Sequence, residues 1–325
     1  MKHPGLRVSV SPHIHSGNSV WKITRDILLG LVPVLFAAWF FFGWEALKIV
    51  AVCAAAAVAA EYLWQKMLGQ TVRIRDGSAL LTGILLGLVL STLTPWWLPP
   101  LGAIVAVIAG KHLFGGLGNH PFNATLVGWA FIQISYGSLM SEAPIPEPQF
   151  LMEPTGYLAY SPLFTLRDSG VGGIEYVPWM DFIWGNVPGL IGTVSVLAVV
   201  IGGAYLLFRR IITWHIPLSF VLSAWIFAFV FWKIDPEIYA NPTFHILSGW
   251  ILLGAFFLAP EKGTAPVTAP GMILYGIGCG VITMIIRLWG SYIEGVPFAI
   301  LLMNAVTPLL DRARPKVIGR IKELA

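Results

Sequence analysis

Long apolar stretches alternate with short polar segments along most of this chain. About ten stretches approach the roughly 20 residues that a membrane-crossing helix needs. They occupy 26–43, 45–65, 78–94, 96–110, 121–137, 187–208, 214–232, 242–259, 271–289 and 295–311. Some are short or interrupted by glycine and proline, so their ends are approximate. The pattern predicts an all-α integral membrane protein with about ten transmembrane helices.

The second half of the chain repeats features of the first half. Four positions keep their mutual spacing at an offset of 176 residues: Gly102, Lys111, Pro121 and Phe122 correspond to Gly278, Arg287, Pro297 and Phe298. Five helices per half is an odd number, so the two halves would face opposite sides of the membrane. We therefore predict two inverted five-helix repeats with a site at their interface. Chance similarity between glycine-rich helices is the alternative.

Polar segments divide the chain into five parts. Residues 1–25 form an N-terminal arm whose His13 and His15 lack a third metal ligand, so we expect a docked arm rather than a metal site. The two repeats occupy 26–137 and 187–311, and a basic tail covers 312–325. Between the repeats lies the only long polar loop, 138–186. A loop of this length inside a compact fold is usually functional.

The composition restricts the class of protein. The chain is 57% hydrophobic and 11% charged, whereas soluble domains are about 25% charged. A net charge of +4 is too small and too dispersed to indicate nucleic-acid binding. The two cysteines, Cys53 and Cys279, lie far apart in apolar stretches, so this chain alone does not provide a zinc or iron–sulfur site.

The distribution of charge predicts the orientation in the membrane. If the N-terminus is cytoplasmic, all 20 basic residues fall on the inner side except Lys48, Arg167, Lys233 and Arg287. This bias satisfies the positive-inside rule. We expect a multi-pass protein of a bacterial cytoplasmic membrane with both termini on the cytoplasmic side.

A glycine-rich break separates two apolar stretches at residues 111–123. Lys111 opens this hinge, and Gly115, Gly116 and Gly118 follow it. Irregular backbone at membrane depth is tolerated only where it is buried in protein or lines a wet cavity, so the hinge is a candidate site. No nucleophile–base arrangement and no Walker or Rossmann motif accompanies it. Any difficult chemistry would therefore belong to a cofactor.

Ionisable residues within the apolar stretches are functional candidates by default. Lys48, Glu61, His245 and Arg287 qualify. Lys48 and Glu61 lie near the ends of their stretches, where they would reach the membrane interface. We therefore expect no proton or sodium site from this chain alone.

Several long motifs resemble one known family. They are SPHIHSG, RDGSALLTGILLGL, GKHLFGGLGNHPFN, WHIPLSF, HILSGWILLGAFF and EGVPFAILLMNAVTPLLD, which extend from Ser11 to Asp311. Together they are similar to RnfD, a membrane component of the Rnf ion-translocating electron-transfer complex. More loosely, they resemble its relative NqrB of the sodium-translocating NADH:quinone reductase. The resemblance implies two inverted five-helix halves, an FMN attached through its phosphate to a threonine of the outer loop, and often a riboflavin between the helices.

The FMN attachment motif is altered in this chain. The matching stretch places Ser161 where the family has its threonine, Tyr160 where it has alanine, and Thr155 where it has an acidic residue. A serine hydroxyl can form the same phosphoester, so Ser161 is the candidate attachment site and Thr165 a weaker one. The alternative is a loop that keeps the family shape without a covalent flavin.

The hinge provides the other candidate flavin ligands. A flavin ring requires flat apolar neighbours and a few polar groups, and a nearby cation favours its reduced, anionic form. Lys111, Asn119, Phe122 and Asn123 offer these properties. A lysine that reaches the interface and a phenylalanine in helix packing are the ordinary structural alternatives.

These inferences predict a membrane subunit of an Rnf-type translocase that works with other membrane and peripheral subunits. It would relay electrons through FMN and riboflavin between ferredoxin and NAD or quinone-level carriers, coupled to Na⁺ or H⁺ translocation. Two other functions fit the same pattern. One is a small-solute transporter or channel of inverted-repeat fold, and the other is a structural anchor protein without flavin.

Overall fold

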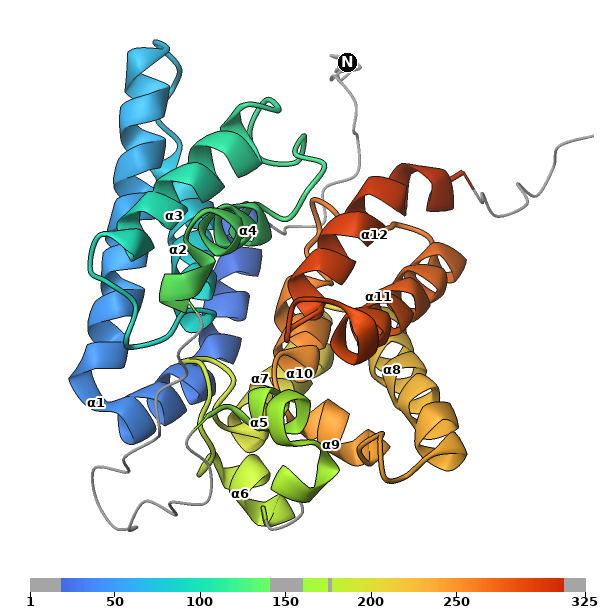
Figure 1. Ribbon diagram of the computed structural model, residues 1–325. Coiled ribbons are helices and arrows are strands. Elements are labelled where there is room, and N and C mark those ends of the chain that lie inside the picture. The colour runs from blue at the N-terminus through green and yellow to red at the C-terminus, as the bar shows by residue number, and fades with distance from the viewer. Residues whose placement is uncertain (1–18, 141–159, 175–176, 313–325) are drawn as a thin grey trace, which may run out of the picture.

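The computed structural model describes residues 19–140, 160–174 and 177–312, and this part of the chain is helical without strands. Three of its helices are long and apolar enough to cross a membrane: α1 (Val20–Met67), α8 (His215–Ile234) and α11 (Ala269–Trp289). Shorter apolar helices cover Ser78–Leu88, Leu98–His112, Val196–Phe208 and Val296–Leu310. Figure 1 shows α1 at the left edge of the molecule and α8 and α11 on the right. The described chain therefore has the make-up of an integral membrane protein.

The first group of helices covers residues 20–136. In α1 the helix is interrupted at Gly43 (φ 64°), which separates the two apolar stretches expected there. A single 3₁₀ turn, η1 (Ile74–Asp76), leads into α2 (Ser78–Leu88), which packs closely on the second part of α1. Next come α3 (Leu98–Val107), a π-helical turn η2 (Ile108–His112) and α4 (Ala124–Tyr136). A short 3₁₀ turn, η3 (Gly137–Met140), ends the group.

The second group covers residues 196–310. It begins with α7 (Val196–Phe208), since residues 187–195, expected inside a membrane span, form turns and irregular structure. The apolar stretch 242–259 is a broken helix composed of α9 (Pro242–Leu247), α10 (Ile251–Leu253) and a π-helical turn, η5 (Gly254–Leu258). The break lies at Ser248-Gly249, where Gly249 has a positive φ of 71°. Helix α12 (Val296–Leu310) completes the group.

The described part of the long polar loop folds against the second group. Its elements are α5 (Pro162–Ser169), η4 (Val171–Gly173) and α6 (Trp179–Trp184). Apolar residues of the loop, including Leu163 and Phe182, form a separate small core with Phe244 of α9. In Figure 1, α5 and α6 lie next to α9 at the lower end of the molecule.

The two groups meet along a continuous apolar core. Trp129 of α4 contacts Trp250 at the helix break with ring centroids 5.0 Å apart. Asn123, at the start of α4, donates a hydrogen bond to the carbonyl oxygen of Leu258 across the same boundary at 3.1 Å. Two cavities lie along this boundary, and each is lined by residues of both groups.

Candidate functional site

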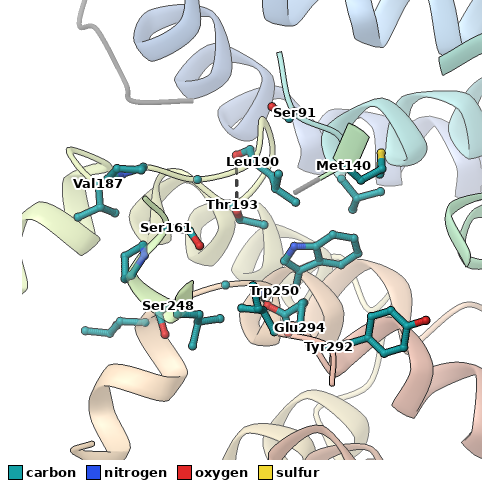
Figure 2. A pocket seen from close by; sticks show the side chains of 18 of the residues that line it. Ser91, Met140, Ser161, Val187, Leu190, Thr193, Ser248, Trp250, Tyr292 and Glu294 are labelled. Atoms are coloured by element: carbon teal, nitrogen blue, oxygen red, sulfur yellow. Dashed lines mark hydrogen bonds between the residues drawn. The ribbon is translucent and has the colours of Figure 1, made fainter. Parts of the chain in front are cut away.

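The first cavity, which we call the loop-side cavity, opens beside α5. Ser161 is the N-cap residue of α5, and its hydroxyl accepts a hydrogen bond from the Phe164 amide at 3.4 Å. Pro162 follows at the first helical position, where its fixed φ favours the helix start. The local sequence therefore fixes Ser161 at a helix N-terminus, and its side chain lines the cavity. Figure 2 shows the Ser161 hydroxyl pointing into this space.

The walls of the loop-side cavity are mainly apolar and aromatic. Its volume is about 160 Å³, and its lining includes Trp129, Phe182, Trp250 and Tyr292. The polar side chains in the lining are Ser91, Gln133, Ser161, Thr193, Ser248 and Glu294. The buried Ser248 hydroxyl has no hydrogen-bond partner within the described part of the chain, so it is available to a ligand.

A charge pair lies at one side of this cavity, and its carboxylate, Glu294, belongs to the lining. Arg287 donates hydrogen bonds to the carbonyl oxygens of His245 (2.7 Å) and Ser248 (3.2 Å), which the helix break leaves free. It also pairs with Glu294 at 2.9 Å, and the Trp250 amide donates to the same carboxylate at 3.1 Å. The pair thus satisfies backbone groups on both sides of the break and holds Trp250 in place.

The second cavity, the hinge-side cavity, lies beside the glycine-rich hinge. Its volume is about 260 Å³. Ile27, Leu85 and Phe257 are among its apolar lining residues, and its polar lining includes Ser78, Thr82, Lys111, His120, Asn123 and Glu261. The lining comes from α1, α2, the hinge, α4 and η5, so both groups of helices contribute.

Lys111 is buried in this structure. Only 3% of its side chain is exposed, and its Nζ donates to Glu61 Oε1 at 2.8 Å and to Ser78 Oγ at 2.6 Å. The interpretation of Lys111 as a lysine that reaches the interface is therefore wrong. Glu61, also expected near the interface, is equally buried, with 2% of its side chain exposed. Lys48, by contrast, is exposed and pairs with Glu45 at 2.6 Å.

The other predicted hinge residues differ in position. Asn123 is buried, caps α4 by accepting from the Leu126 amide, and lines the hinge-side cavity. Asn119 is exposed and donates to the Gly115 carbonyl oxygen, and Phe122 is half-buried. Neither lines the cavity, so the structure brings together only Lys111 and Asn123 of the four hinge candidates.

The structure adds two hinge-side residues that the sequence reasoning missed. His120 Nε2 lies 3.4 Å from Glu261 Oε1, and both side chains line the cavity. Burial alone would lower the pKa of His120, but the hydrogen bond and charge of Glu261 and the Gly116 carbonyl raise its pKa above 6.5. The sequence shows the GNHP motif and Glu261, but nothing in it indicates that His120 and Glu261 lie together.

The loop candidates also differ in position. The Thr165 hydroxyl donates to the Ser161 carbonyl oxygen at 3.2 Å, and Thr165 does not line the loop-side cavity. Thr155 lies outside the described residues. Ser161 is therefore the one of the two loop hydroxyls that faces a cavity. The described residues contain no cluster of metal-ligating side chains.

Both cavities suit a flat, largely apolar ring with a polar edge. Trp129 and Trp250 offer aromatic surface in the loop-side cavity, and the unpartnered Ser248 hydroxyl offers a polar contact. In the hinge-side cavity Lys111 provides a cation and Asn123 an amide beside apolar walls. These residue types fit a flavin.

The described part of the chain is therefore a helical membrane protein with two cavities between its groups of helices. Residues 7–319 match the NQR2, RnfD, RnfE family. The chain is 40% identical over 326 residues to the D subunit of the Na(+)-translocating ferredoxin:NAD(+) oxidoreductase complex of Acetobacterium woodii, covering 99% of this chain and 98% of that protein. It is 33% identical over 351 residues to the D subunit of the ion-translocating oxidoreductase complex of Erwinia tasmaniensis, covering 98% of this chain and 99% of the relative. The chain belongs to the NQR2, RnfD, RnfE family.

Proposed function

We propose that this chain is the RnfD membrane component of an Rnf-type ion-translocating ferredoxin:NAD⁺ oxidoreductase complex. Its relatives in Acetobacterium woodii and Erwinia tasmaniensis bear names of this kind and match it over nearly their full length. Flavin bound in the two cavities would accept electrons and pass them on, and other subunits of the complex would exchange those electrons with soluble carriers. Coupling to Na⁺ or H⁺ transfer belongs to the whole complex.

In the loop-side cavity, Ser161 carries FMN through a phosphoester. The observation that carries this proposal is the position of the Ser161 hydroxyl, at the N-terminus of α5 and open to an aromatic cavity. The unpaired amides and the dipole of a helix N-terminus favour a phosphate group there. Trp129, Trp250 and the Ser248 hydroxyl would hold the ring and orient it.

In the hinge-side cavity, a riboflavin binds without a covalent bond. Lys111 places a positive charge beside the ring, and Asn123, another lining residue, offers an amide. Apolar residues such as Leu85 and Phe257 would exclude water from the faces of the ring. Both cavities lie where the two groups of helices meet, which is where a site between repeats is expected.

We infer that the two groups of helices are inverted repeats of five spans each, with both termini cytoplasmic. The corresponding residues Lys111 and Arg287 support this arrangement. Lys111 contacts Ser78 at the start of α2, and Arg287 contacts His245 and Ser248 of the equivalent apolar stretch. In each repeat the cation therefore contacts the third apolar stretch of its own half, although the groups that it contacts differ.

The test of this function is the state of the flavin in the purified complex. Flavin fluorescence that remains on this chain in a denaturing gel indicates a covalent bond, and Ser161→Ala should abolish it while Ser161→Thr keeps it. Ser169→Ala is the matched control, because Ser169 lies on the same helix and its hydroxyl donates to the adjacent Asp168 rather than facing the cavity. Persistent fluorescence in Ser161→Ala would refute the attachment site. A colourless protein would instead favour a solute transporter or a structural anchor.

A further inference from the structure

A continuous series of hydrogen bonds leads from the partly exposed Asp76, past the wall of the hinge-side cavity, to the buried carboxylate of Glu61. Ser78 Oγ donates to Asp76 Oδ1 at 2.7 Å, and Lys111 Nζ donates to Ser78 Oγ at 2.6 Å. The same Nζ donates to Glu61 Oε1 at 2.8 Å. Asp76 is partly exposed, whereas the other three residues are buried. The series thus connects solvent with the interior through groups that can each gain or lose a proton.

Two members of this series also line the cavity. Ser78 and Lys111 are lining residues, whereas Asp76 and Glu61 are not. Lys111 lies in the π-helical turn η2, and such turns are frequent at functional sites. A ligand in the hinge-side cavity would therefore lie beside the two middle members of the series.

The buried pair of Lys111 and Glu61 joins three helical elements, but taking both charges out of water costs desolvation free energy. Apolar residues of similar volume often stabilise a protein as well as a buried pair or better, so the pair alone does not explain the charges. The bonding of Glu61 is also one-sided. Its Oε1 receives Lys111 and the Gln65 amide (3.1 Å) and lies 3.4 Å from His112 Nε2, whereas its Oε2 has no partner among the described residues.

We propose that Asp76, Ser78 and Lys111 form a proton path from the protein surface to the hinge-side cavity. Glu61 is a positioning residue that holds the Lys111 ammonium group at the cavity wall. This inference rests on the proposed binding of a flavin in that cavity, and it goes further by naming the residues that supply its proton.

The path balances protons and electrons as follows. The Lys111 ammonium would supply the proton that a flavin takes up when the complex reduces it, and an N–H bond of Lys111 would break in this transfer. Lys111 is then a neutral amine. A hydronium ion at the surface protonates Asp76 and becomes water. The Ser78 hydroxyl, which donates to Asp76 in the starting state, then turns to the Lys111 amine and gives it a proton while Ser78 Oγ takes the proton of Asp76. The net uptake is one proton from hydronium, and all residues return to their starting states.

The Ser78 side chain is the link that a substitution can interrupt. Valine and threonine have similar volumes and differ in the hydroxyl. Both are larger than serine, so neither substitution opens a gap that a bridging water could fill. The experiment uses the complex in the Ser161→Ala background. Riboflavin is quantified by extraction, and the bleaching of flavin absorbance is followed after mixing with dithionite in H₂O and in D₂O.

We expect Ser78→Val to keep its riboflavin but to be reduced on the order of 100-fold more slowly, the low end of what a positioned proton donor contributes. Its solvent isotope effect should rise, because proton transfer limits the rate. Ser78→Thr should retain the original rate. Asp76→Asn changes no lining residue and should also be reduced slowly, so it tests the path even where Ser78→Val fails to fold.

The possible failures are distinguishable. A complex with full riboflavin content and an unchanged rate in Ser78→Val or Asp76→Asn overturns the proton path and leaves the proposed function intact. A complex that keeps Ser78 but holds no noncovalent flavin overturns the proton path together with the riboflavin site of the proposed function. Ser223→Ala is the control for loss of a helix hydroxyl, because Ser223 lines neither of the two cavities and its hydroxyl bonds carbonyls of α8 and α11.

Discussion

Lys111 and Glu61, fifty positions apart in the chain, form an ion pair of 2.8 Å with almost no exposure to solvent. The pair joins the second part of α1 to the turn that ends α3. Because neither charge is close to water, each depends on the other for its stability in the interior.

Removing one member of this pair should be costly. We expect Lys111→Met to lower the free energy of unfolding by about 3–5 kcal/mol, because Glu61 is left as a buried, unpaired charge. The double substitution Lys111→Met with Glu61→Gln should recover most of this loss. Thermal unfolding of the four proteins of this double-mutant cycle measures the coupling, and additive losses would contradict it.

The contact between His120 and Glu261 should depend on pH. The contact with Glu261 favours the protonated ring of His120, and the pKa of His120 is therefore raised above 6.5 in the folded protein. Its stabilising contribution is complete below the unfolded pKa and is lost as the pH rises through the higher folded value. Amide exchange around Glu261 should therefore be slow below about pH 6.5 and become faster as the pH rises above that value.

His120→Gln is the matched variant for this measurement. It keeps a side-chain donor but cannot be protonated, so exchange around Glu261 should lose its pH dependence beyond the chemical rate. A pH dependence equal to that of the unchanged protein would show that another group is responsible.

The Arg287 contacts predict a local effect at the helix break. Arg287→Met leaves the carbonyl oxygens of His245 and Ser248 without their donor and should cost about 1–3 kcal/mol for each buried group left unpaired. Because Trp250 bonds to Glu294, its fluorescence should also shift. Arg287→Lys retains the charge but not the planar guanidinium, so its stability should lie between that of Arg287→Met and that of the unchanged protein.

Close packing between the helix groups gives a further prediction. A β carbon at Gly202 of α7 would collide with the carbonyl oxygen of Gly30 in α1. Gly202→Ala should therefore cost about 1–3 kcal/mol through backbone displacement. Gly172→Ala is the control, because nothing lies within 4 Å of its β-carbon position. Equal thermal stability of the two variants would refute the packing argument.

The sequence predicted the helical architecture well because apolar length is a local property. It also predicted a break near Gly43, where α1 is interrupted. Ser161 was predicted as an attachment residue only, and the cavity beside it was not foreseen. Membrane helices, however, are apolar on most sides, so their sequences do not reveal which face meets which neighbour. For that reason the burial of Glu61, its pairing with Lys111 and the contact of His120 with Glu261 were not foreseen. Asn119 and Phe122 were placed by proximity in sequence, whereas backbone direction in the hinge decides which side chains reach the cavity.

The space beside Gly249 has a consequence for how this chain can vary. A β carbon there would meet Glu294 Oε2 and Arg287 Nη2, and the positive φ excludes most other residues as well. Substitution of Gly249 is therefore opposed both by its backbone conformation and by the two charged side chains beside it. A residue with a side chain could replace the glycine only if the Arg287–Glu294 pair moved or were lost, and it would still have to adopt the left-handed backbone conformation.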